Sequence, residues 1–461
     1  MITDNYKRFF IRTLGCKVNQ YESQAMREIL ERAGYRESST ESMADVYIVN
    51  TCTVTDRADK ESRHILNLMH RENPRAKIVV TGCYVERDAE TLSFLPGITH
   101  VIRNADKIDI AHILDERRTT NDPSTPRQSS GSMVSRVEPS TGSGSSRAMS
   151  RDDERLREYP FMITDFKDHT KAFVKIQDGC ENFCAYCKVP LVRSVLWSKP
   201  LAHIVDEVKV LVGKGFKEIV LAGICLGLWG RGLSGSGASL IDVLKALEAV
   251  PGDFRIRLSS IEPKHVTAEL IDYIASHARM CRHLHIPLQS GDDQILALMH
   301  RPYTAGFYRE LVGAARARMP DIAITTDIMT GFPGEGDEHH KRTLAFVKEF
   351  LPARTHIFSY SMRRGTAACD LPGEPDRQTK RRRYFSLKVA ALSASYLYRR
   401  RYLNQKLDVL VENARDGRTG LLVGYSDNYI RVQFRGGDEL MGRIIPVKVV
   451  DLVLLYTWGE L

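Results

Sequence analysis

The sequence lacks any long apolar run. Of its 461 residues, 43% are hydrophobic and 27% are charged, and no uninterrupted apolar segment approaches the length of about 20 residues that a helix needs to span a bilayer. The first 12 residues are polar and contain no apolar stretch followed by a small-residue cleavage site. We therefore expect a cytoplasmic protein with no membrane partner.

The cysteine content argues against a disulfide scaffold. The chain has nine cysteines, an odd number, and no secretory signal accompanies them, so a disulfide framework is not expected. The length excludes a small disulfide-stapled, fibrous or fully disordered protein, because it allows a sizeable core in about two or three domains. The spacing of the cysteines is then the main evidence that the sequence offers.

Acidic residues are fewer than basic residues in this sequence. Lys and Arg total 66 against 57 Asp and Glu, a formal net charge of +9, which favours a polyanionic partner such as nucleic acid. Much of the excess lies in residues 371–405, where Glu374 and Asp376 accompany nine basic residues. A solvated helix face is the alternative interpretation of this basic run.

Apolar patterning divides the chain into four segments. Residues 1–118 predict an α/β domain with strands at 10–14, 46–49, 78–81 and 100–102. Residues 119–158 are rich in Ser and Gly and have too few apolar residues to pack, which predicts a disordered linker. Residues 159–400 contain six candidate strands separated by helical patterns, at 173–176, 218–222, 255–259, 283–288, 323–327 and 356–360.

Six βα units in series predict a parallel sheet curled into a partial (β/α)6 barrel, because parallel strands need right-handed crossover helices. Chemistry on such a sheet belongs at the carboxyl ends of the strands. One of the expected helices places Ile204, Val208 and Leu211 on a single face. Residues 401–461 change to short strand-like runs broken by turns, which predict a small β-barrel of the size of an oligonucleotide-binding module.

The most informative cysteines are Cys180, Cys184 and Cys187, a C-x3-C-x2-C triplet directly after the first strand of the central segment. Three thiolates on one loop can bind three irons of a four-iron cluster and leave the fourth iron open for a ligand. A structural zinc site is the alternative, but zinc prefers a closed set of four ligands and no fourth Cys or His is close in sequence. The triplet therefore predicts an iron–sulfur cluster.

A second set consists of Cys16, Cys52 and Cys83, each just past a candidate strand. Strand ends of one parallel sheet lie at the same edge, so the three thiols could converge in a second three-cysteine site. Three buried cysteines acting as small apolar residues remain the alternative. For the remaining cysteines, Cys225, Cys281 and Cys369, we expect a structural role.

Two turns follow strands of the central segment at the edge where the triplet lies. One comprises Gln289, Ser290 and Gly291, and the other runs from Gly331 to Glu335. A Gly-rich turn alone is weak evidence, but this position suggests contact with a cofactor. His339 and His340 lack ligand spacing to a third group, and we expect both on a helix surface.

These features together resemble the radical S-adenosylmethionine (SAM) methylthiotransferase family. The resemblance covers the whole chain apart from the linker and is carried by motifs in family order: TLGCKVNQYES at 13–23, NTCTVT at 50–55, TGCY at 81–84, the triplet, SSIEP at 259–263, HIPLQSG at 285–291, DIMTGFPGE at 327–335 and GYSDNYIRV at 424–432. The continuation after Cys16 and the last motif resemble the branch that acts on N6-threonylcarbamoyladenosine next to the anticodon.

The resemblance implies an N-terminal α/β domain, a central radical SAM partial barrel and a C-terminal TRAM-like RNA-binding barrel. It implies two [4Fe-4S] clusters, one at each cysteine set, and SAM as cofactor, cleaved with one electron to a 5′-deoxyadenosyl radical that removes hydrogen from C2 of the adenine. The second cluster would carry the methylated sulfur. The partners implied are the anticodon stem-loop of tRNA and an electron donor such as a flavodoxin-type reductant.

The resemblance also assigns site residues. SAM would contact Tyr186, Gln289, Ser290, Gly331 and Glu335. RNA-binding candidates, for which a structural role in the barrel is the alternative, are Tyr425, Asn428, Tyr429 and Arg431.

Some positions depart from the family pattern. After the triplet the chain keeps Arg193 but has Ser194 for Gly, Trp197 for Arg and Lys199 for Arg, and Cys225 replaces the usual His. Such changes can misplace a reacting group. A catalytically silent iron–sulfur RNA-binding protein is therefore one alternative. A methylthiotransferase acting on isopentenyladenosine tRNA or on a ribosomal protein is the other.

Overall fold

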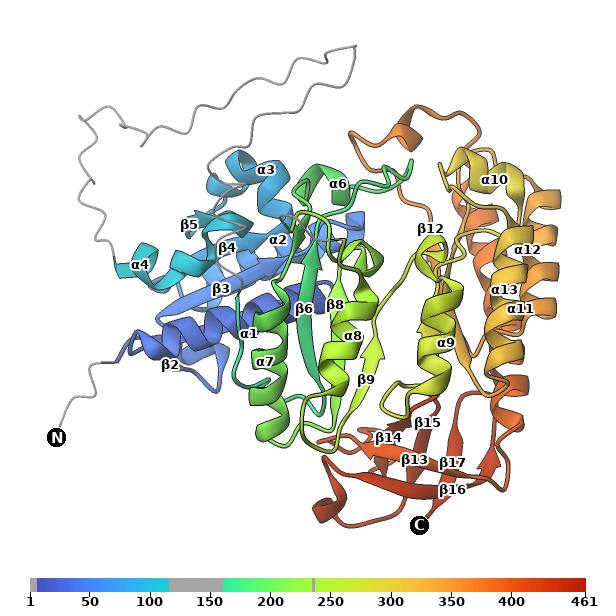
Figure 1. Ribbon diagram of the computed structural model, residues 1–461. Helices are drawn as coiled ribbons and strands as arrows, with labels where there is room; N and C mark the ends of the chain where they lie inside the picture. Colours follow the sequence, from blue (N-terminus) through green and yellow to red (C-terminus); the bar gives the residue numbers. More distant parts are fainter. Residues whose placement is uncertain (1–5, 116–160, 234–236) are drawn as a thin grey trace.

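The computed structural model describes residues 6–115, 161–233 and 237–461 (Figure 1). The linker predicted for residues 119–158 lies outside the described residues. Among the described helices, none is both long and apolar enough to cross a membrane.

The N-terminal domain is a five-stranded parallel sheet in the order β2-β1-β3-β4-β5. Its strands are β1 (Arg8–Thr13), β2 (Arg36–Glu37), β3 (Val46–Thr51), β4 (Lys77–Gly82) and β5 (Ile98–Ile102). Its helices are α1 (Lys17–Arg32), α2 (Asp56–Glu72), α3 (Cys83–Ser93) and α4 (Ile110–Asp115). All six residues of β3 are buried, as expected for the central strand of a parallel sheet covered on both faces. The prediction of an α/β domain is confirmed.

The central domain contains the six predicted parallel strands. They are β6 (Ala172–Asp178), β8 (Glu218–Gly223), β9 (Arg255–Leu258), β10 (His283–His285), β11 (Ala323–Thr330) and β12 (Arg354–Ser359). The hydrogen-bonded ladder is divided into β7-β6-β8-β9, which begins with the short antiparallel β7 (Trp197–Ser198), and β10-β11-β12. Two isolated bridges, Ile256 with Met280 and Ser260 with His285, span the division. The strand predicted for 283–288 ends at His285, and Pro287, just beyond, has no N–H for a ladder.

Helices cover the outside of the central sheet (Figure 1). The predicted face of α7 is confirmed, because Ile204, Val208 and Leu211 are fully buried in the large core of this domain. The helices are α6 (Val189–Val192), α7 (Leu201–Gly213), α8 (Leu240–Glu248), α9 (Ala268–Ser276), α10 (Asp293–Leu298), α11 (Ala305–Arg318), α12 (Asp337–Phe350) and α13 (Arg377–Arg400).

The last strands form the predicted closed barrel in the order β13-β14-β15-β17-β16. They are β13 (Lys406–Val411), β14 (Leu422–Ser426), β15 (Arg431–Phe434), β16 (Ile444–Leu452) and β17 (Thr457–Glu460). Figure 1 shows this barrel below the central domain, at the amino ends of the parallel strands and away from the cysteine loops.

Two arginines of β9 hold the C-terminal barrel in place. Arg255 donates to the carbonyl oxygens of Asp408 and Tyr425 at 3.1 and 2.8 Å, and Arg257 donates to those of Asp427 and Ser426 at 2.8 and 3.0 Å. Glu218, which is fully buried, accepts from both guanidinium groups at 2.7 and 2.8 Å. Burial would raise the pKa of Glu218, but Arg257 and Arg255 outweigh burial and hold it well below its usual range.

The basic run of α13 is only partly available to a partner. Arg383 is buried and donates to the backbone oxygen of Glu335 at 2.6 Å, and Arg399 is buried and donates to the carbonyl of Leu454 at 2.6 Å. The exposed basic residues of the run are Arg377, Arg381, Arg382, Lys388, Arg400 and Arg401. Arg383 and Arg399 therefore have structural roles, and both interpretations of this segment, a polyanion-binding surface and a solvated helix face, concern its exposed basic residues.

We predict that Glu218→Gln destabilises the protein at neutral pH, because it leaves two buried guanidinium groups without a carboxylate, a loss of about 3–5 kcal/mol for a broken buried pair. The folded-state pKa of Glu218 is lowered, so its contribution is complete above the unfolded-state pKa of about 4.3 and falls below that pH. Urea unfolding should show a larger difference from wild type at pH 7 than at pH 3.

The control is Glu269→Gln, which removes an exposed carboxylate from α9. It should leave stability nearly unchanged at both pH values. A Glu218→Gln difference that stays constant or grows as the pH falls would contradict the role given to this carboxylate.

Candidate cluster and cofactor sites

The three N-terminal cysteines converge at the carboxyl ends of their strands. Cys16 follows β1, Cys52 follows β3 and Cys83 begins α3 directly after β4. A Cβ added to Gly15 would lie 2.8 Å from the Cβ and 2.9 Å from the Sγ of Cys52, so the Cys16 loop packs directly on Cys52. Burial, together with the neighbouring Cys83 and Cys16, raises the pKa of Cys52 to about 12. The fold thus gathers three thiols from distant parts of the chain.

Two backbone positions make this approach possible. Gly15 has φ +99° and Gly82 has φ +98°, values that favour glycine. A side chain at Gly82 would also lie 2.3 Å from the backbone oxygen of Thr51. Asn19 fixes the neighbouring loops, because its Nδ2 donates to the carbonyls of Leu14 at 2.8 Å and Thr51 at 2.9 Å.

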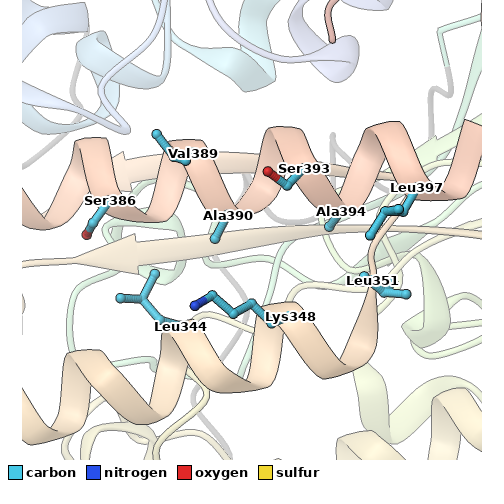
Figure 2. Close-up of a pocket in the computed structure, with 9 residues that line it drawn as sticks. All are labelled: Leu344, Lys348, Leu351, Ser386, Val389, Ala390, Ser393, Ala394 and Leu397. Atoms are coloured by element: carbon cyan, nitrogen blue, oxygen red, sulfur yellow. The ribbon is translucent and has the colours of Figure 1, made fainter. Parts of the chain in front are cut away.

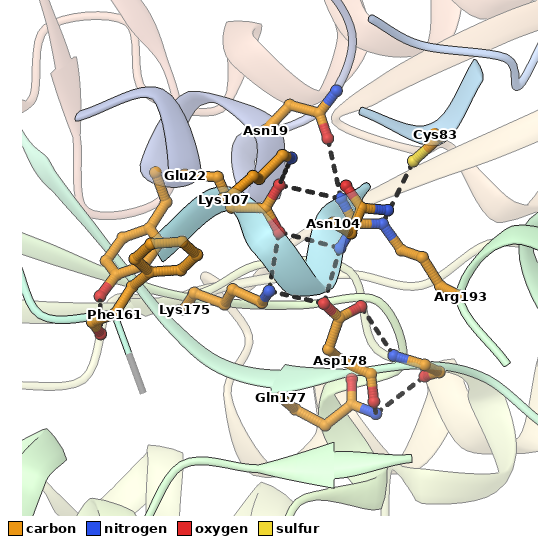
Figure 3. A network of polar contacts seen from close by, with 12 residues as sticks. Asn19, Glu22, Cys83, Asn104, Lys107, Phe161, Lys175, Gln177, Asp178 and Arg193 are labelled. Atoms are coloured by element: carbon orange, nitrogen blue, oxygen red, sulfur yellow. Dashed lines mark hydrogen bonds and ion pairs between the residues drawn. The ribbon is translucent and has the colours of Figure 1, made fainter. Parts of the chain in front are cut away.

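Arg193, which follows the central triplet, reaches into the N-terminal domain (Figure 3). Its Nε donates to the Sγ of Cys83 at 3.2 Å, and its terminal nitrogens donate to Glu22 at 2.9 and 3.1 Å and to Asp178 at 2.6 Å. Glu22, on α1, also accepts from Lys107 at 2.5 Å and from Lys175 of β6 at 2.7 Å. All of these side chains are buried or nearly so.

Without the thiol of Cys83, the positive charges in this network outnumber the negative charges. Three cations, Lys107, Lys175 and Arg193, surround two carboxylates, Glu22 and Asp178. Burial would raise the pKa of Glu22, but Arg193, Lys107 and Lys175 hold it well below its usual range. A thiolate at Cys83 would supply the third negative charge, which suits a metal ligand.

The central triplet lies in the loop after β6. The guanidinium of Arg301 donates to the Sγ of Cys184 at 3.0 Å, and the backbone N–H of Val189 donates to the Sγ of Cys187 at 3.4 Å. Burial raises the pKa of Cys187 to about 12, whereas a hydrogen bond from Cys225 lowers the pKa of Cys180 to about 7. Three thiols with donors aimed at two of them fit the donor set of an iron–sulfur cluster.

Three residues near the cysteines were not found by sequence reasoning. Arg301 pairs with Glu262 and reaches the triplet. Arg363 donates to the carbonyl of Thr53 at 2.5 Å and to Asp59 at 2.7 Å, so it fixes the loop after Cys52 from the central domain. Cys225, given only a structural role, lies beside Cys180. The quoted SSIEP motif contained Glu262, but no local pattern pointed to its arginine partner.

The residues predicted to contact SAM lie on the triplet loop and on the two turns described above. Tyr186 packs edge-on against Phe332 of the second turn, with ring centroids 6.4 Å apart. The backbone N–H of Gln289 donates to the carbonyl of Asp327 at 2.8 Å, and Met329 N–H donates to the carbonyl of Gln289 at 2.9 Å, so the two turns lie side by side. Gly331 has φ +74°. Contact of these residues with SAM stays a prediction.

Two of these side chains already have protein partners. Ser290 is buried, with its hydroxyl 3.3 Å from that of Thr343. The carboxylate of Glu335 accepts from the backbone N–H of Gly331 and from Arg383, so it closes the turn. The surface position predicted for His340 is wrong: its ring is buried and its Nε2 lies 2.7 Å from the hydroxyl of Ser386. His339 is partly exposed on the same helix, and its Nδ1 accepts from the backbone N–H of Gly336 at 2.9 Å.

Three of the predicted RNA-binding residues line one pocket. Tyr425, Tyr429 and Arg431 border a cavity of about 430 Å³ together with the basic residues Arg354 and Lys388. Asn428 differs, because it is buried and its Oδ1 accepts from the hydroxyl of Ser426 at 2.5 Å. The structure thus favours the structural alternative for Asn428 and leaves the other three at a basic, aromatic surface.

A second cavity is lined mainly by apolar side chains. A groove of about 450 Å³ lies between α12 and α13, where Ala390 and Ala394 leave room between the helices (Figure 2). Its walls are mostly apolar, with Lys348 as the charged residue, so it presents no set of groups for catalysis or metal binding.

The departures from the family pattern are accommodated. Ser194 does not adopt a positive φ, so this position does not require glycine here. Lys199 is buried and pairs with Glu207 at 2.6 Å and with the hydroxyl of Tyr21 at 2.8 Å. Trp197 is also buried, and the Nζ of Lys175 lies 5.7 Å from its ring centroid.

Comparisons with known proteins match nearly the whole chain. The model of the uncharacterized protein family UPF0004 matches residues 8–102, and that of the radical SAM superfamily matches residues 174–347. The threonylcarbamoyladenosine tRNA methylthiotransferase MtaB of Bacillus subtilis is 34% identical over 97% of this chain and 95% of its own length. The protein of the same name from Thermotoga maritima is 36% identical over 96% and 94%.

Related proteins with another name also match. The tRNA-2-methylthio-N(6)-dimethylallyladenosine synthase of Clostridium tetani is 30% identical over 98% of this chain and 96% of its own length. Among solved structures, the radical S-adenosylmethionine methyltransferase TsrM of Kitasatospora setae has a TM-score of 0.56 at 16% identity, covering 79% of this chain and 74% of that one. This last similarity concerns the fold alone.

We predict that Arg193→Met destabilises the protein by about 3–5 kcal/mol, because it leaves buried carboxylates with fewer cationic partners. The loss should also lower the iron bound at the N-terminal cysteines, because Cys83 loses its neighbouring cation. Chemical unfolding and iron analysis would measure both effects. The control Arg231→Met removes a mostly exposed arginine that pairs with Glu181, and should change neither; equal effects of the two substitutions would contradict the role given to Arg193.

Proposed function

Because the chain belongs to the family of radical SAM tRNA methylthiotransferases, we propose that it adds a methylthio group to C2 of N6-threonylcarbamoyladenosine, next to the anticodon of tRNA. The observation that carries the proposal is the pair of three-thiol sites, one on each domain, connected by Arg193 through Cys83. Relatives named for threonylcarbamoyladenosine match at 33–36% identity and those named for dimethylallyladenosine at 30–31%. The substrate named for the first group is therefore the one that we propose for this chain.

The donor sets fit two iron–sulfur clusters. Cys180, Cys184 and Cys187 would bind the cluster that chelates SAM, and the second set, Cys16, Cys52 and Cys83, would bind another. When bound, the first cluster would supply the electron that cleaves SAM to methionine and the 5′-deoxyadenosyl radical, which removes hydrogen from C2, and the second cluster would supply the sulfur. An unactivated C–H bond is a poor target for acid–base chemistry, which is why a radical is needed.

The chain's own residues would hold and insulate these groups. Arg301 places a positive charge beside the Cys184 sulfur, and Arg193 does so beside the Cys83 sulfur. The buried contacts of Glu22 with Lys175 and Arg193 fix the N-terminal domain against β6, and so fix the spacing of the two thiol sets. SAM would lie against Tyr186, Gln289 and the backbone of the two turns, with Ser290, Gly331 and Glu335 shaping them.

The tRNA would contact the exposed basic residues of α13 and the pocket lined by Tyr425, Tyr429 and Arg431. Aromatic faces can stack on unpaired bases, and arginine and lysine can neutralise phosphates. The anticodon stem-loop is the part of tRNA that must reach the central domain. The proposed setting is the cytoplasm, where tRNA and a flavodoxin-type electron donor would be available.

The proposal predicts a change in the nucleosides of tRNA. Cells lacking the gene should contain threonylcarbamoyladenosine without its 2-methylthio form, and restoring the intact gene should produce that form. A Cys180→Ala version should fail to restore it. Mass spectrometry of nucleosides from bulk tRNA is the measurement, and it would also detect 2-methylthio-isopentenyladenosine.

Three results would each contradict a different part of the proposal. A change confined to methylthio-isopentenyladenosine would identify the other tRNA substrate. An unchanged set of methylthio nucleosides would exclude tRNA and favour a ribosomal protein as substrate, or a silent RNA-binding protein. Restoration by Cys180→Ala would exclude the triplet from the reaction.

The two-cluster proposal predicts separable iron losses. Anaerobically reconstituted Cys180→Ala and Cys16→Ala proteins should each lose about four irons, because each keeps one complete three-thiol site. The control Cys281→Ala removes a buried thiol outside both sets, and should keep the wild-type iron content. If Cys16→Ala binds as much iron as wild type, the second cluster does not exist at these residues.

A further inference from the structure

Three side chains from neighbouring strands meet inside the partial barrel: His285 of β10, Asp327 of β11 and His356 of β12. The Oδ1 of Asp327 lies 3.3 Å from the Nε2 of His285 and 3.3 Å from the Nδ1 of His356. One ligand atom from each residue lies within 4.8 Å of the others. All three residues are partly exposed, so a small ion could reach them.

The alternation of β11 places this group on the inner face of the sheet. Thr326 contacts the hydroxyl of Tyr308 from α11 at 3.3 Å, and Ile328 is fully buried, so these residues face the covering helices. Asp327 therefore points to the opposite, inner side. The group also lies beside the proposed SAM pocket, because the backbone oxygen of Asp327 accepts from the N–H of Gln289 at 2.8 Å.

The contacts of these residues are incomplete. The Oδ1 of Asp327 is a buried oxygen without a hydrogen bond, although two imidazole nitrogens flank it. Their distance of 3.3 Å is long for a charged hydrogen bond, which measures about 2.7–2.9 Å. It fits ligand atoms that share one ion, because two ligands at about 2.1 Å from a metal lie about 3.0–3.4 Å apart.

A neighbouring hydroxyl orients one imidazole. The Oγ1 of Thr325 lies 2.9 Å from the Nδ1 of His285 and 2.9 Å from the Nε2 of His283. If the Nδ1 of His285 donates to this hydroxyl, its Nε2 has a free lone pair directed at the carboxylate. Metal-bound histidines commonly have this arrangement, in which the second nitrogen donates to a partner outside the coordination shell.

From this geometry we propose that His285, Asp327 and His356 bind a first-row divalent cation, such as Mn²⁺, Fe²⁺ or Zn²⁺, inside the barrel. Two imidazoles and one carboxylate are a known ligand set for such ions, and they leave coordination positions open. The ion would lie beside the SAM pocket and apart from both cysteine sets.

The open positions suit an anionic oxygen of the substrate. Without an ion, the carboxylate of Asp327 would repel a carboxylate of the substrate, whereas a bound divalent cation would attract it. The threonylcarbamoyl group has a carboxylate that the isopentenyl group lacks, so the cation would select the first. This role rests on the proposed function, but the binding of the ion does not.

The test is a titration with Mn²⁺ alone, because this ion prefers nitrogen and oxygen ligands to thiolates. The protein is the full chain with its clusters reconstituted under anaerobic conditions, and the signal is the electron paramagnetic resonance of free Mn²⁺. Wild type should bind one tight Mn²⁺. His356→Ala and Asp327→Asn should bind it at least about tenfold more weakly, with unchanged iron content and cluster absorbance.

The matched control is His203→Ala, which removes an exposed histidine from α7, and it should bind Mn²⁺ like wild type. Equal Mn²⁺ binding by wild type and His356→Ala would overturn the proposed site, and would leave direct pairing of the imidazoles with Asp327 as the explanation of the geometry. Weakening by His203→Ala to the same degree would also overturn it.

A kinetic test separates the proposed role in substrate binding from the binding of the ion. His356→Ala should raise the KM for tRNA containing threonylcarbamoyladenosine and change kcat little, and added Mn²⁺ should not restore it. An unchanged KM would overturn the carboxylate role while the Mn²⁺ titration still decides the site. If wild type modifies no such tRNA, the proposed function fails, and the titration remains valid.

Discussion

The buried carboxylate of Glu22 is the contact on which the arrangement of the two sites depends. It lies on α1, six residues after Cys16, and accepts from Lys107 of its own domain and from Lys175 and Arg193 of the central domain. A buried charge is tolerated only when its partners are fixed. The same requirement that keeps Glu22 ionised therefore holds the N-terminal domain against β6 and brings Arg193 to Cys83.

This coupling gives each cysteine set a cation from elsewhere in the chain. Arg193 leaves the loop after the triplet to contact Cys83, and Arg301 comes from the segment after α10 to contact Cys184. A guanidinium beside a sulfur favours the thiolate, the form that binds iron, against the burial that raises the pKa of Cys83. The proposed clusters would thus lie in one continuous polar structure that spans both domains.

The same principle operates at the opposite end of the central sheet. Glu218 orients Arg255 and Arg257, which donate to carbonyl oxygens of the C-terminal barrel. Tyr429 stacks on His283 with ring centroids 4.3 Å apart, which ties the proposed RNA surface to the strand that provides His285. Buried ion pairs thus help to position both the N-terminal and the C-terminal domain against the central domain. The apolar core alone, being non-directional, would not fix these orientations.

The sequence by itself determined the alternation of strands and helices, the small C-terminal β-barrel and the positions of Cys16, Cys52, Cys83 and the triplet just past strands, because these depend on local periodicity and on turns. It could not determine that Glu22 meets Arg193, 171 residues away, or that Cys225 lies beside Cys180. Nor could it show that the side chains of His285, Asp327 and His356 come together across three strands, or that Arg383 and Arg399 are buried within a basic run. Those outcomes depend on how strands pair and helices pack, and side chains of the same type look alike in sequence whether they end in solvent or against a partner.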